Sequence, residues 1–249
     1  MGTVRDRRAA RPGRVPGVKA VIFDFYGTLV RMVPPLPRSH ESILRARGLH
    51  EAAERWGDQW SVGPGDGEDH TAHSGSEESY LAWERGRLRE RAIACGVPRE
   101  LAGELAAEVD ASIKSLRLEL FGDVTAALAE LRERGLTVAL CSNWFWDLER
   151  AADEAGLAGL IDVAVTSARA GARKPHPLIY RTVLGECGVD PGDALFVGDM
   201  WQADVAGPLA QGMRAVHLWR PDRAVEGEAP PLPGRAARIT GLEELSGLL

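Results

Sequence analysis

Hydrophobic and polar positions divide the chain into three kinds of segment. Residues 1–17 are rich in Arg, Pro and Gly and have almost no apolar side chains, so we expect a disordered tail. Residues 18–30 and 119–249 alternate short apolar runs with amphipathic stretches, whereas residues 31–118 are almost entirely helical in pattern. We therefore predict one core that is interrupted by a large helical insertion.

The core carries the pattern of a parallel sheet. Its first apolar run, Ala20–Phe23, is too short for a helix and too uniformly apolar for a half-exposed strand. Alternation of strand and helix after residue 119 predicts an α/β fold, a Rossmann-like doubly wound sheet with helices on both faces. Later strands are predicted at residues 137–141, 161–165, 194–197 and 214–218, and helices at 123–134, 145–155, 176–187, 202–211 and 242–249.

The insertion has apolar residues at helical spacing, for example Leu101, Leu105 and Val109. We interpret residues 31–118 as a mostly helical cap domain and expect no strand in it. Its helices are predicted at residues 39–47, 51–60, 76–95 and 98–116, with a polar, glycine-rich loop at 63–75.

Composition narrows the classes of partner. A net charge of −6, with no extended basic patch beyond the tail, argues against nucleic acid. The three cysteines, Cys95, Cys141 and Cys187, are far apart and form no C-x-x-C, which favours a reducing compartment. No apolar run is long enough to span a membrane. We expect a cytoplasmic monomer or homodimer that binds a small molecule.

Polar residues follow one predicted strand after another. Asp24 ends the first strand, Ser142 ends the second, Lys174 comes shortly after the third, and Asp199 with Asp204 follows the fourth. Singly, such residues are commonly helix caps, solvated charges or turn residues. Because parallel strands place their carboxyl ends at one edge of the sheet, their recurrence predicts a shared site.

The chemistry that these residues suggest is displacement at an anionic centre. Asp24 would be the nucleophile, and Lys174 would keep it ionised and neutralise the transferring group. Asp24 and Asp199, with Asp204 nearby, form a hard oxygen site that suits Mg²⁺. Groups expected to hold phosphoryl oxygens are Ser142, Asn143 and the backbone N–H groups of Gly27 and Thr28.

Four segments resemble, in order and spacing, the motifs of the haloacid dehalogenase-like (HAD) hydrolase superfamily. The resemblance covers about Val18 to Leu218, and it implies a Rossmann-like core with a cap after the first strand, an aspartyl nucleophile, usually Mg²⁺, and most often phosphatase activity. It also implies that the backbone carbonyl of Tyr26 ligates the metal. The segments are residues 24–29 (Asp-Phe-Tyr-Gly-Thr-Leu), Ser142-Asn143, Lys174-Pro175 and residues 198–204 (Gly-Asp-Met-Trp-Gln-Ala-Asp).

Tyr26 departs from the phosphatase pattern, in which a second Asp at this position protonates the leaving group. A phenol with a pKa of about 10 is a poor acid at neutral pH. The tyrosine is similar to the first motif of the L-2-haloacid dehalogenase branch, whose halide leaving group needs no proton. That branch lacks the carboxylate that Asp199 provides, so the metal ligand favours phosphoryl chemistry.

Two further features bear on the substrate. Trp144 and Trp201 each follow a strand-end residue closely, and either line the mouth of the crevice as an aromatic wall or pack the cap against the core. The polar loop contains Asp66, Asp69, His70 and His73, which would make a second metal site or replace the missing acid, although such loops usually do neither.

We therefore predict a Mg²⁺-dependent HAD-like phosphatase that acts on a small organic phosphate through an aspartyl-phosphate intermediate. The alternatives are a 2-haloacid dehalogenase that uses the same Asp24, and a binding protein of this fold that has lost turnover.

Overall fold

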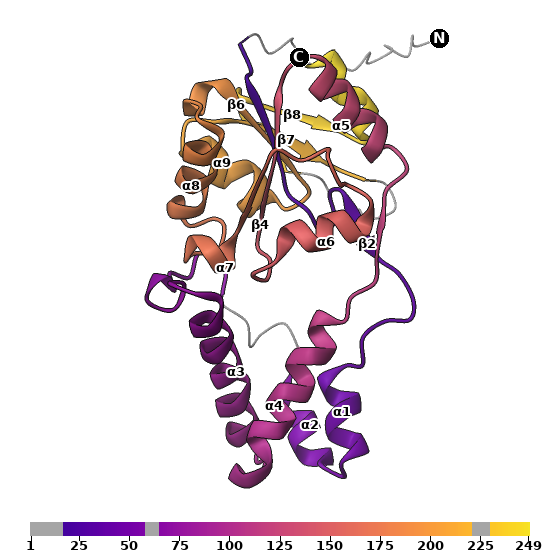
Figure 1. Ribbon diagram of the computed structural model, residues 1–249, viewed down its shortest axis with the longest axis vertical. Helices are drawn as coiled ribbons and strands as arrows, with labels where there is room; N and C mark the ends of the chain where they lie inside the picture. The colour runs from indigo at the N-terminus through magenta and orange to yellow at the C-terminus, as the bar shows by residue number, and fades with distance from the viewer. Residues whose placement is uncertain (1–16, 58–64, 221–229) are drawn as a thin grey trace, which may run out of the picture.

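The computed structural model describes residues 17–57, 65–220 and 230–249. The predicted disordered tail lies outside the described residues except for Gly17, and so does the end of the helix predicted to reach Trp60. In Figure 1 the described part divides into a sheet-containing core and a lobe of helices below it.

Six parallel strands form the central sheet, in the order β5-β4-β1-β6-β7-β8. The strand β1 (Ala20–Phe23) lies between β4 (Thr137–Ser142) and β6 (Ala194–Gly198), with Phe23 opposite Leu140 and Val197. The remaining strands are β5 (Val163–Thr166), β7 (Arg214–Leu218) and β8 (Ala236–Ile239). Because β1 is central and fully buried, the loop after it opens at the middle of the sheet edge.

Helices cover both faces of the sheet, as the alternation predicted. Val21 and Phe23 belong to a cluster with the helices α5 (Val124–Glu133) and α6 (Leu148–Ala155), whereas Ile22 points to the other face and packs with α8 (Pro177–Cys187). This two-residue periodicity, apolar on both sides, is what a covered parallel strand requires. The fold class is therefore confirmed as α/β.

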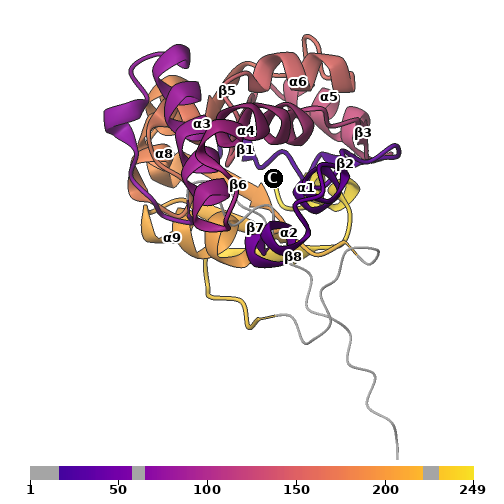
Figure 2. The same ribbon diagram turned by 90° about the horizontal axis from the view of Figure 1, so that it is seen from below.

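Helices α1 (His40–Ala46), α2 (His50–Trp56), α3 (Glu77–Ala94) and α4 (Arg99–Lys114) form the helical lobe. The lobe has a hydrophobic cluster of its own, which includes Trp56 and Leu105. Seen from below in Figure 2, the lobe projects over the end of the sheet. No helix in the described ranges is long and apolar enough to cross a membrane.

The root of the lobe differs from the sequence-based expectation of an insertion without strands. Strands β2 (Val30–Met32) and β3 (Leu118–Leu120) pair antiparallel at the two points where the chain leaves and re-enters the core. Each has only three residues, too few for a period of two to be visible in the sequence.

Other differences concern the ends of elements. The strand predicted at 161–165 is β5, two residues later at its start, and α6 begins at Leu148 rather than at 145. The helix predicted at 202–211 is a π-helix (Trp201–Ala206) followed by α9 (Gly207–Ala210). The last helix is the 3₁₀-helix Leu242–Gly247. Helix α7 (Ser167–Ala170) and strand β8 were not predicted.

Candidate functional site

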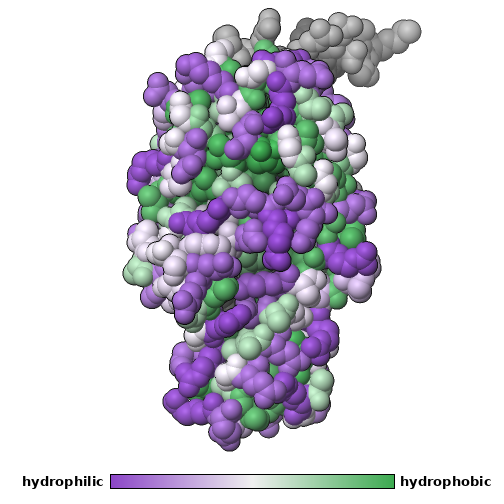
Figure 3. Space-filling view, in the orientation of Figure 1, coloured by the Kyte–Doolittle hydropathy of each residue, from purple (hydrophilic) through white to green (hydrophobic). Residues whose placement is uncertain are grey.

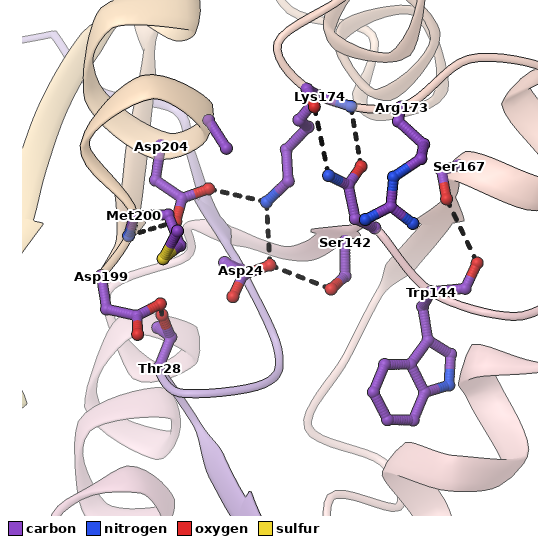
Figure 4. Close-up of polar contacts among 12 residues, drawn as sticks. Asp24, Thr28, Ser142, Trp144, Ser167, Arg173, Lys174, Asp199, Met200 and Asp204 are labelled. Carbon is purple, nitrogen blue, oxygen red and sulfur yellow. Dashed lines mark hydrogen bonds and ion pairs between the residues drawn. The ribbon is translucent and has the colours of Figure 1, made fainter. Parts of the chain in front are cut away.

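Asp24 lies at the carboxyl end of β1, buried beneath two donors. Its Oδ1 accepts hydrogen bonds from the Ser142 hydroxyl at 2.9 Å and from Lys174 Nζ at 2.8 Å. Ser142 is the last residue of β4, the neighbouring strand, and Lys174 follows α7. Figure 4 shows these side chains converging on the Asp24 carboxylate from separate segments. The sequence-based prediction that they share a site agrees with this geometry.

Asp204 completes the network from the π-helix after β6. Its Oδ1 accepts a hydrogen bond from Lys174 Nζ at 2.6 Å, and its Oδ2 accepts one from the Met200 backbone N–H at 2.9 Å. The carboxyl group lies directly over Gly198, where a Cβ atom would come within 2.4 Å of it. Gly198 is therefore needed because Asp204 occupies the space of a side chain.

The two carboxylates stabilise the charge on Lys174, whereas burial disfavours the charge on Asp204. Burial raises the pKa of Asp204 to about 7. Burial also opposes the charge on Lys174, but the carboxylates of Asp204 and Asp24 outweigh it and raise the pKa of Lys174 above the ordinary lysine value. The lysine therefore carries the proton at neutral pH, and its ammonium group faces Asp24 from within the protein.

Three carboxylates are close enough to share a cation. Asp24, Asp199 and Asp204 each offer an oxygen atom, and these atoms lie within 4.8 Å of one another. Hard oxygen donors in this number fit Mg²⁺ rather than a softer metal. Both oxygens of Asp204 already accept hydrogen bonds, so Asp24 and Asp199 fit direct ligation better, with Asp204 holding Lys174 beside them.

Asp199 is held on two sides. Thr28, which is buried in the turn after β1, donates its hydroxyl to Asp199 Oδ1 at 3.4 Å. The backbone carbonyl of Asp199 accepts a hydrogen bond from His217 Nε2 at 3.2 Å, because His217 Nδ1 is occupied as an acceptor by Arg238 Nε–H at 3.1 Å. Burial lowers the pKa of His217, which agrees with a neutral ring in this arrangement.

The turn after β1 corrects one sequence-based assignment. Gly27, at φ +92°, was expected to direct its backbone N–H at the substrate, but this group donates to the Val30 carbonyl at 2.8 Å. The N–H groups of Phe25 and Thr28 have no partner in the described part of the chain and are the better donors to an oxyanion. A sequence cannot show which N–H of a tight turn closes the turn itself.

The side chain of Asn143 is engaged with the loop that carries Lys174. Its Oδ1 accepts a hydrogen bond from the Lys174 backbone N–H at 2.7 Å, and its Nδ2 donates to the Lys174 carbonyl at 3.1 Å. The side chain thus positions the lysine, and a role of Asn143 in holding phosphoryl oxygens stays a prediction.

The two tryptophans do not form one wall. Trp144 packs edge-on against Phe25, with ring centroids 5.2 Å apart, and its carbonyl accepts a hydrogen bond from Ser167. Trp201 instead contacts His217, at 5.4 Å. Among the described residues no ring contact joins the two tryptophans. The sequence left two roles open, an aromatic wall at the crevice mouth or packing of the cap against the core, and these ring contacts lie within the core.

A pocket of about 400 Å³ lies between the helical lobe and α6. Trp144, Phe145 and Trp146 form its core side, and Arg85 and Lys114 belong to its lobe side. The surface narrows at this junction in Figure 3. The pocket adjoins the segment after Ser142, but Asp24 and Lys174 are not among its lining residues.

The polar loop does not form a second metal site among the described residues. Asp69 accepts hydrogen bonds from the backbone and hydroxyl of Thr71, which lower its pKa. His70 is buried against Trp83, and His73 stacks on the same ring at 4.9 Å. None of these residues contacts Asp24. The loop instead docks on the segment that carries Lys174, a role that the sequence did not indicate.

Sequence reasoning also missed two arginines. Arg220 donates to both oxygens of Asp123 at 2.9 and 3.0 Å and to the Thr28 carbonyl at 3.0 Å, so it supports the turn after β1 from behind. Arg173 stands directly before Lys174, and this neighbouring position is the sequence signal that could have drawn attention to it. Its backbone N–H donates to the Glu68 carbonyl at 3.1 Å.

Known proteins resemble the chain in both sequence and fold. It is 39% identical over 162 residues to the phosphoserine phosphatase of Thermus thermophilus, covering 62% of this chain and 63% of that one, so it spans less than two thirds of that relative. A HAD phosphatase structure from Thermococcus onnurineus superposes with a TM-score of 0.61 at 24% identity, covering 92% of this chain and 97% of that one. A 2-haloacid dehalogenase from Pseudomonas syringae gives 0.60 at 24% identity, with coverage of 93% and 97%.

At these identities the two structures show the shared fold alone. The sequence family is shown by a wider match, because the model of the haloacid dehalogenase-like hydrolases covers residues 18–212. This range contains Asp24, Ser142, Lys174 and Asp204, the residues that meet at the sheet edge. The resemblance noted in the sequence is thus confirmed, and the chain belongs to the haloacid dehalogenase-like hydrolases.

Proposed function

We propose that the protein is a Mg²⁺-dependent phosphatase that hydrolyses a small organic phosphate through an aspartyl-phosphate intermediate. The observation that carries the proposal is the buried network in which Lys174 Nζ bridges Asp24 and Asp204 at the end of the sheet. The phosphatase name of the Thermus thermophilus relative supports a phosphate ester as the substrate. In this proposal residues 31–118 are the cap, which covers the site.

Asp24 attacks the phosphorus atom, a carboxylate oxygen forms the new bond, and the ester oxygen leaves with the electron pair. Ser142 and Lys174 hold Asp24 Oδ1, so the second oxygen, Oδ2, is the attacking atom. Lys174 and the N–H groups of Phe25 and Thr28 balance the charge of the phosphoryl oxygens. Water then cleaves the acyl phosphate, which restores Asp24 and releases inorganic phosphate.

Mg²⁺ would be held by Asp24, Asp199 and the Tyr26 carbonyl. When bound, it neutralises charge on the transferring phosphoryl group. Asp204 acts on the site by holding Lys174 and the Met200 backbone in place. The three free cysteines support a reducing compartment, and we propose the cytoplasm.

The leaving group has no acid at position 26. An aryl or acyl phosphate, whose leaving group departs without a proton, would therefore turn over faster than an alkyl phosphate. The same tyrosine is the observation that keeps a 2-haloacid dehalogenase as the second candidate function.

The test is an assay of phosphate release from acyl, aryl and alkyl phosphates, in Mg²⁺ and in EDTA, beside halide release from 2-chloropropionate. We expect phosphate release in Mg²⁺ alone and a loss of at least about 1,000-fold in Asp24→Asn. Asp153→Asn, the same change at an exposed position, is the control. Metal-independent halide release would establish the dehalogenase instead, and no turnover of either kind would favour a binding protein.

A further inference from the structure

The π-helix that carries Asp204 is closed in an unusual way. At its end the Gly207 N–H donates to the Gln202 carbonyl, five residues back, where an α-helix would use the carbonyl four residues back. That carbonyl belongs to Ala203, the residue directly before Asp204. The π-turn therefore takes from Ala203 the N–H group that an α-helix would give it.

The next residue cannot supply the missing donor. In a π-helix that continued, the N–H of residue 208 would bond to the Ala203 carbonyl, but residue 208 is a proline and has no N–H. Ala203 is buried, and a buried carbonyl needs a hydrogen-bond partner from within the protein. The partner has to come from a side chain.

The hydroxyl of Tyr180, on α8, takes the place of that N–H. It donates to the Ala203 carbonyl at 2.5 Å. Burial raises the pKa of Tyr180, so the hydroxyl keeps the proton that it donates. The ring is fully buried and packs edge-on against Phe196 of β6, with centroids 5.9 Å apart, which fixes the direction of the hydroxyl.

Gly207 makes room for this hydroxyl. Its backbone is helical, at φ −59° and ψ −55°, so its own conformation does not call for a glycine. A Cβ atom at this position, however, would overlap the Tyr180 hydroxyl. The chain thus combines a tyrosine, a glycine and a proline that together fit a π-turn closed by a side chain.

The turn closed in this way holds the residue next to Ala203. The Asp204 carboxylate accepts hydrogen bonds from Lys174 Nζ at 2.6 Å and from the Met200 N–H at 2.9 Å, as Figure 4 shows. If the Gly207 N–H bonded to the Ala203 carbonyl instead, the turn would shorten to that of an α-helix and move Asp204.

We propose that Tyr180 is a positioning residue of the site: its hydroxyl replaces a backbone N–H, keeps the helix after β6 in the π form and thereby holds Asp204 against Lys174. The effect of Tyr180 on turnover rests on the proposed function, whereas its effect on the position of Asp204 does not.

The test begins with Tyr180→Phe, which removes the hydroxyl and keeps the ring. Hydrogen exchange at the Met200 amide reports the position of the Asp204 carboxylate that holds it. We expect this exchange to accelerate about tenfold or more. For an aryl phosphate, kcat should fall about tenfold or more, with a smaller change in KM, because Lys174 loses a partner that positions its charge.

Two controls accompany this variant. Unchanged exchange at the amides of β4 shows that the sheet is folded. Tyr80→Phe removes another buried tyrosine hydroxyl, on α3, and should leave exchange at the Met200 amide unchanged.

Pro208→Ala provides a readout that a packing role of Tyr180 would not move. It introduces a backbone N–H at the position from which a π-turn reaches the Ala203 carbonyl. In the Tyr180→Phe background it should restore the exchange rate at Met200 and kcat to within about threefold of the unsubstituted protein. Alone, it should leave both within the same range.

Normal exchange at Met200 in Tyr180→Phe, or losses that Pro208→Ala leaves in place, would overturn the inference. Faster exchange with unchanged kcat would overturn it as well, because Asp204 would then move without an effect on turnover. Exchange is measured without substrate, so it tests the position of Asp204 even if the unsubstituted protein releases no phosphate. That result would remove the proposed function alone.

Discussion

In the proposed function, Tyr26 limits which leaving groups can depart, because a phenol is a poor acid at neutral pH. The residue is partly buried, and it packs against the hydrophobic cluster that contains Phe23 and Leu140. It stands two residues after Asp24, where the phosphatases that the sequence resembles have an acid. The site therefore combines a buried lysine and three neighbouring carboxylates with a tyrosine that is no strong proton donor at neutral pH.

Tyr26→Asp tests this directly. A carboxyl group at position 26 would protonate an alkoxide, so we expect kcat/KM for an alkyl phosphate to rise at least about tenfold relative to an aryl phosphate. Tyr26→Phe removes the hydroxyl without adding an acid and should leave that ratio unchanged. If Tyr26→Asp changed kcat/KM for the alkyl and the aryl phosphate by the same factor, protonation of the leaving group would not depend on residue 26.

Gly198 gives a second prediction at this scale. Alanine there would place its Cβ within 2.4 Å of the Asp204 carboxyl group, which cannot move without releasing Lys174 or the Met200 N–H. We expect Gly198→Ala to lower kcat about 100-fold or more, as expected when a charged group that acts in the transition state is displaced. Gly103→Ala, on α4 where a Cβ meets nothing within 4 Å, should keep full activity. Normal turnover in Gly198→Ala would mean that Asp204 does not position the lysine.

Sequence predicted which residues meet, but not what each one does. Asp24, Ser142, Lys174 and Asp204 could be found because strand ends of a parallel sheet share an edge. The contacts of Asn143 could not, since an amide side chain beside a strand can face either the substrate or a neighbouring backbone. That choice depends on where the Lys174 loop lies, which local sequence does not set.

At the scale of elements, the last part of the chain helps to hold the turn after β1 in place. Asp123, before α5, binds Arg220 through both oxygens and also accepts the N–H of Leu242, where the last 3₁₀-helix begins. Arg220 continues to the Thr28 carbonyl and lies over the Phe121 ring at 4.0 Å. One ion pair thus joins β7, α5 and the turn after β1.

Removing this pair should destabilise the protein in a pH-dependent way. Burial opposes ionisation of Asp123, but the bonds from Arg220 and Leu242 outweigh it and lower the pKa of Asp123. A lowered pKa stabilises the fold above the ordinary carboxyl value, and this contribution is lost as the pH falls through the folded-state value.

We therefore expect Asp123→Asn to lower the free energy of unfolding by about 3 kcal/mol at pH 7, with the difference shrinking below about pH 4. Urea unfolding at a series of pH values measures it, and Asp153→Asn is the exposed control. A difference that grew as the pH fell would contradict the assignment.

The accuracy of the predicted helices and strands depends on how far their hydrophobic pattern extends. The long, periodic helices α3 and α4 were predicted to within two residues, because their apolar faces recur over several turns. Strand β8 was not predicted, since Ala236–Ile239 has little apolar character and is defined by its pairing with β7. The π-helix after β6 carries Asp204, whose carboxyl group lies over Gly198, and a contact of this kind leaves no trace in the local pattern.

At the scale of the whole molecule, the helical lobe contacts the core at a third place besides β2 and β3. The described part of the polar loop, from Gly65 to Gly75, lies along the segment before Lys174. The His70 N–H donates to the Gly171 carbonyl at 2.7 Å, and Asp69 pairs with Ala172 as an antiparallel bridge. The Gly67 N–H donates to the Lys174 carbonyl itself, at 3.3 Å. The lobe is therefore attached to the loop that carries Lys174, the proposed catalytic lysine, and we expect the two to move together.

Gly171→Ala should break this attachment. Gly171 has φ +80°, and a Cβ there would come within 2.6 Å of Thr71 in the docked loop. Gly188→Ala is the matched control, because Gly188 has φ +64° but meets nothing within 4 Å, so it shares the backbone strain without the clash. We expect hydrogen exchange at the amides of His70 and Arg173 to accelerate about tenfold or more in Gly171→Ala alone, together with a fall in kcat. Adding Thr71→Gly to Gly171→Ala removes the clashing side chain and should restore part of the protection from exchange. Equal exchange in Gly171→Ala and Gly188→Ala would show that the lobe and the loop that carries Lys174 move independently.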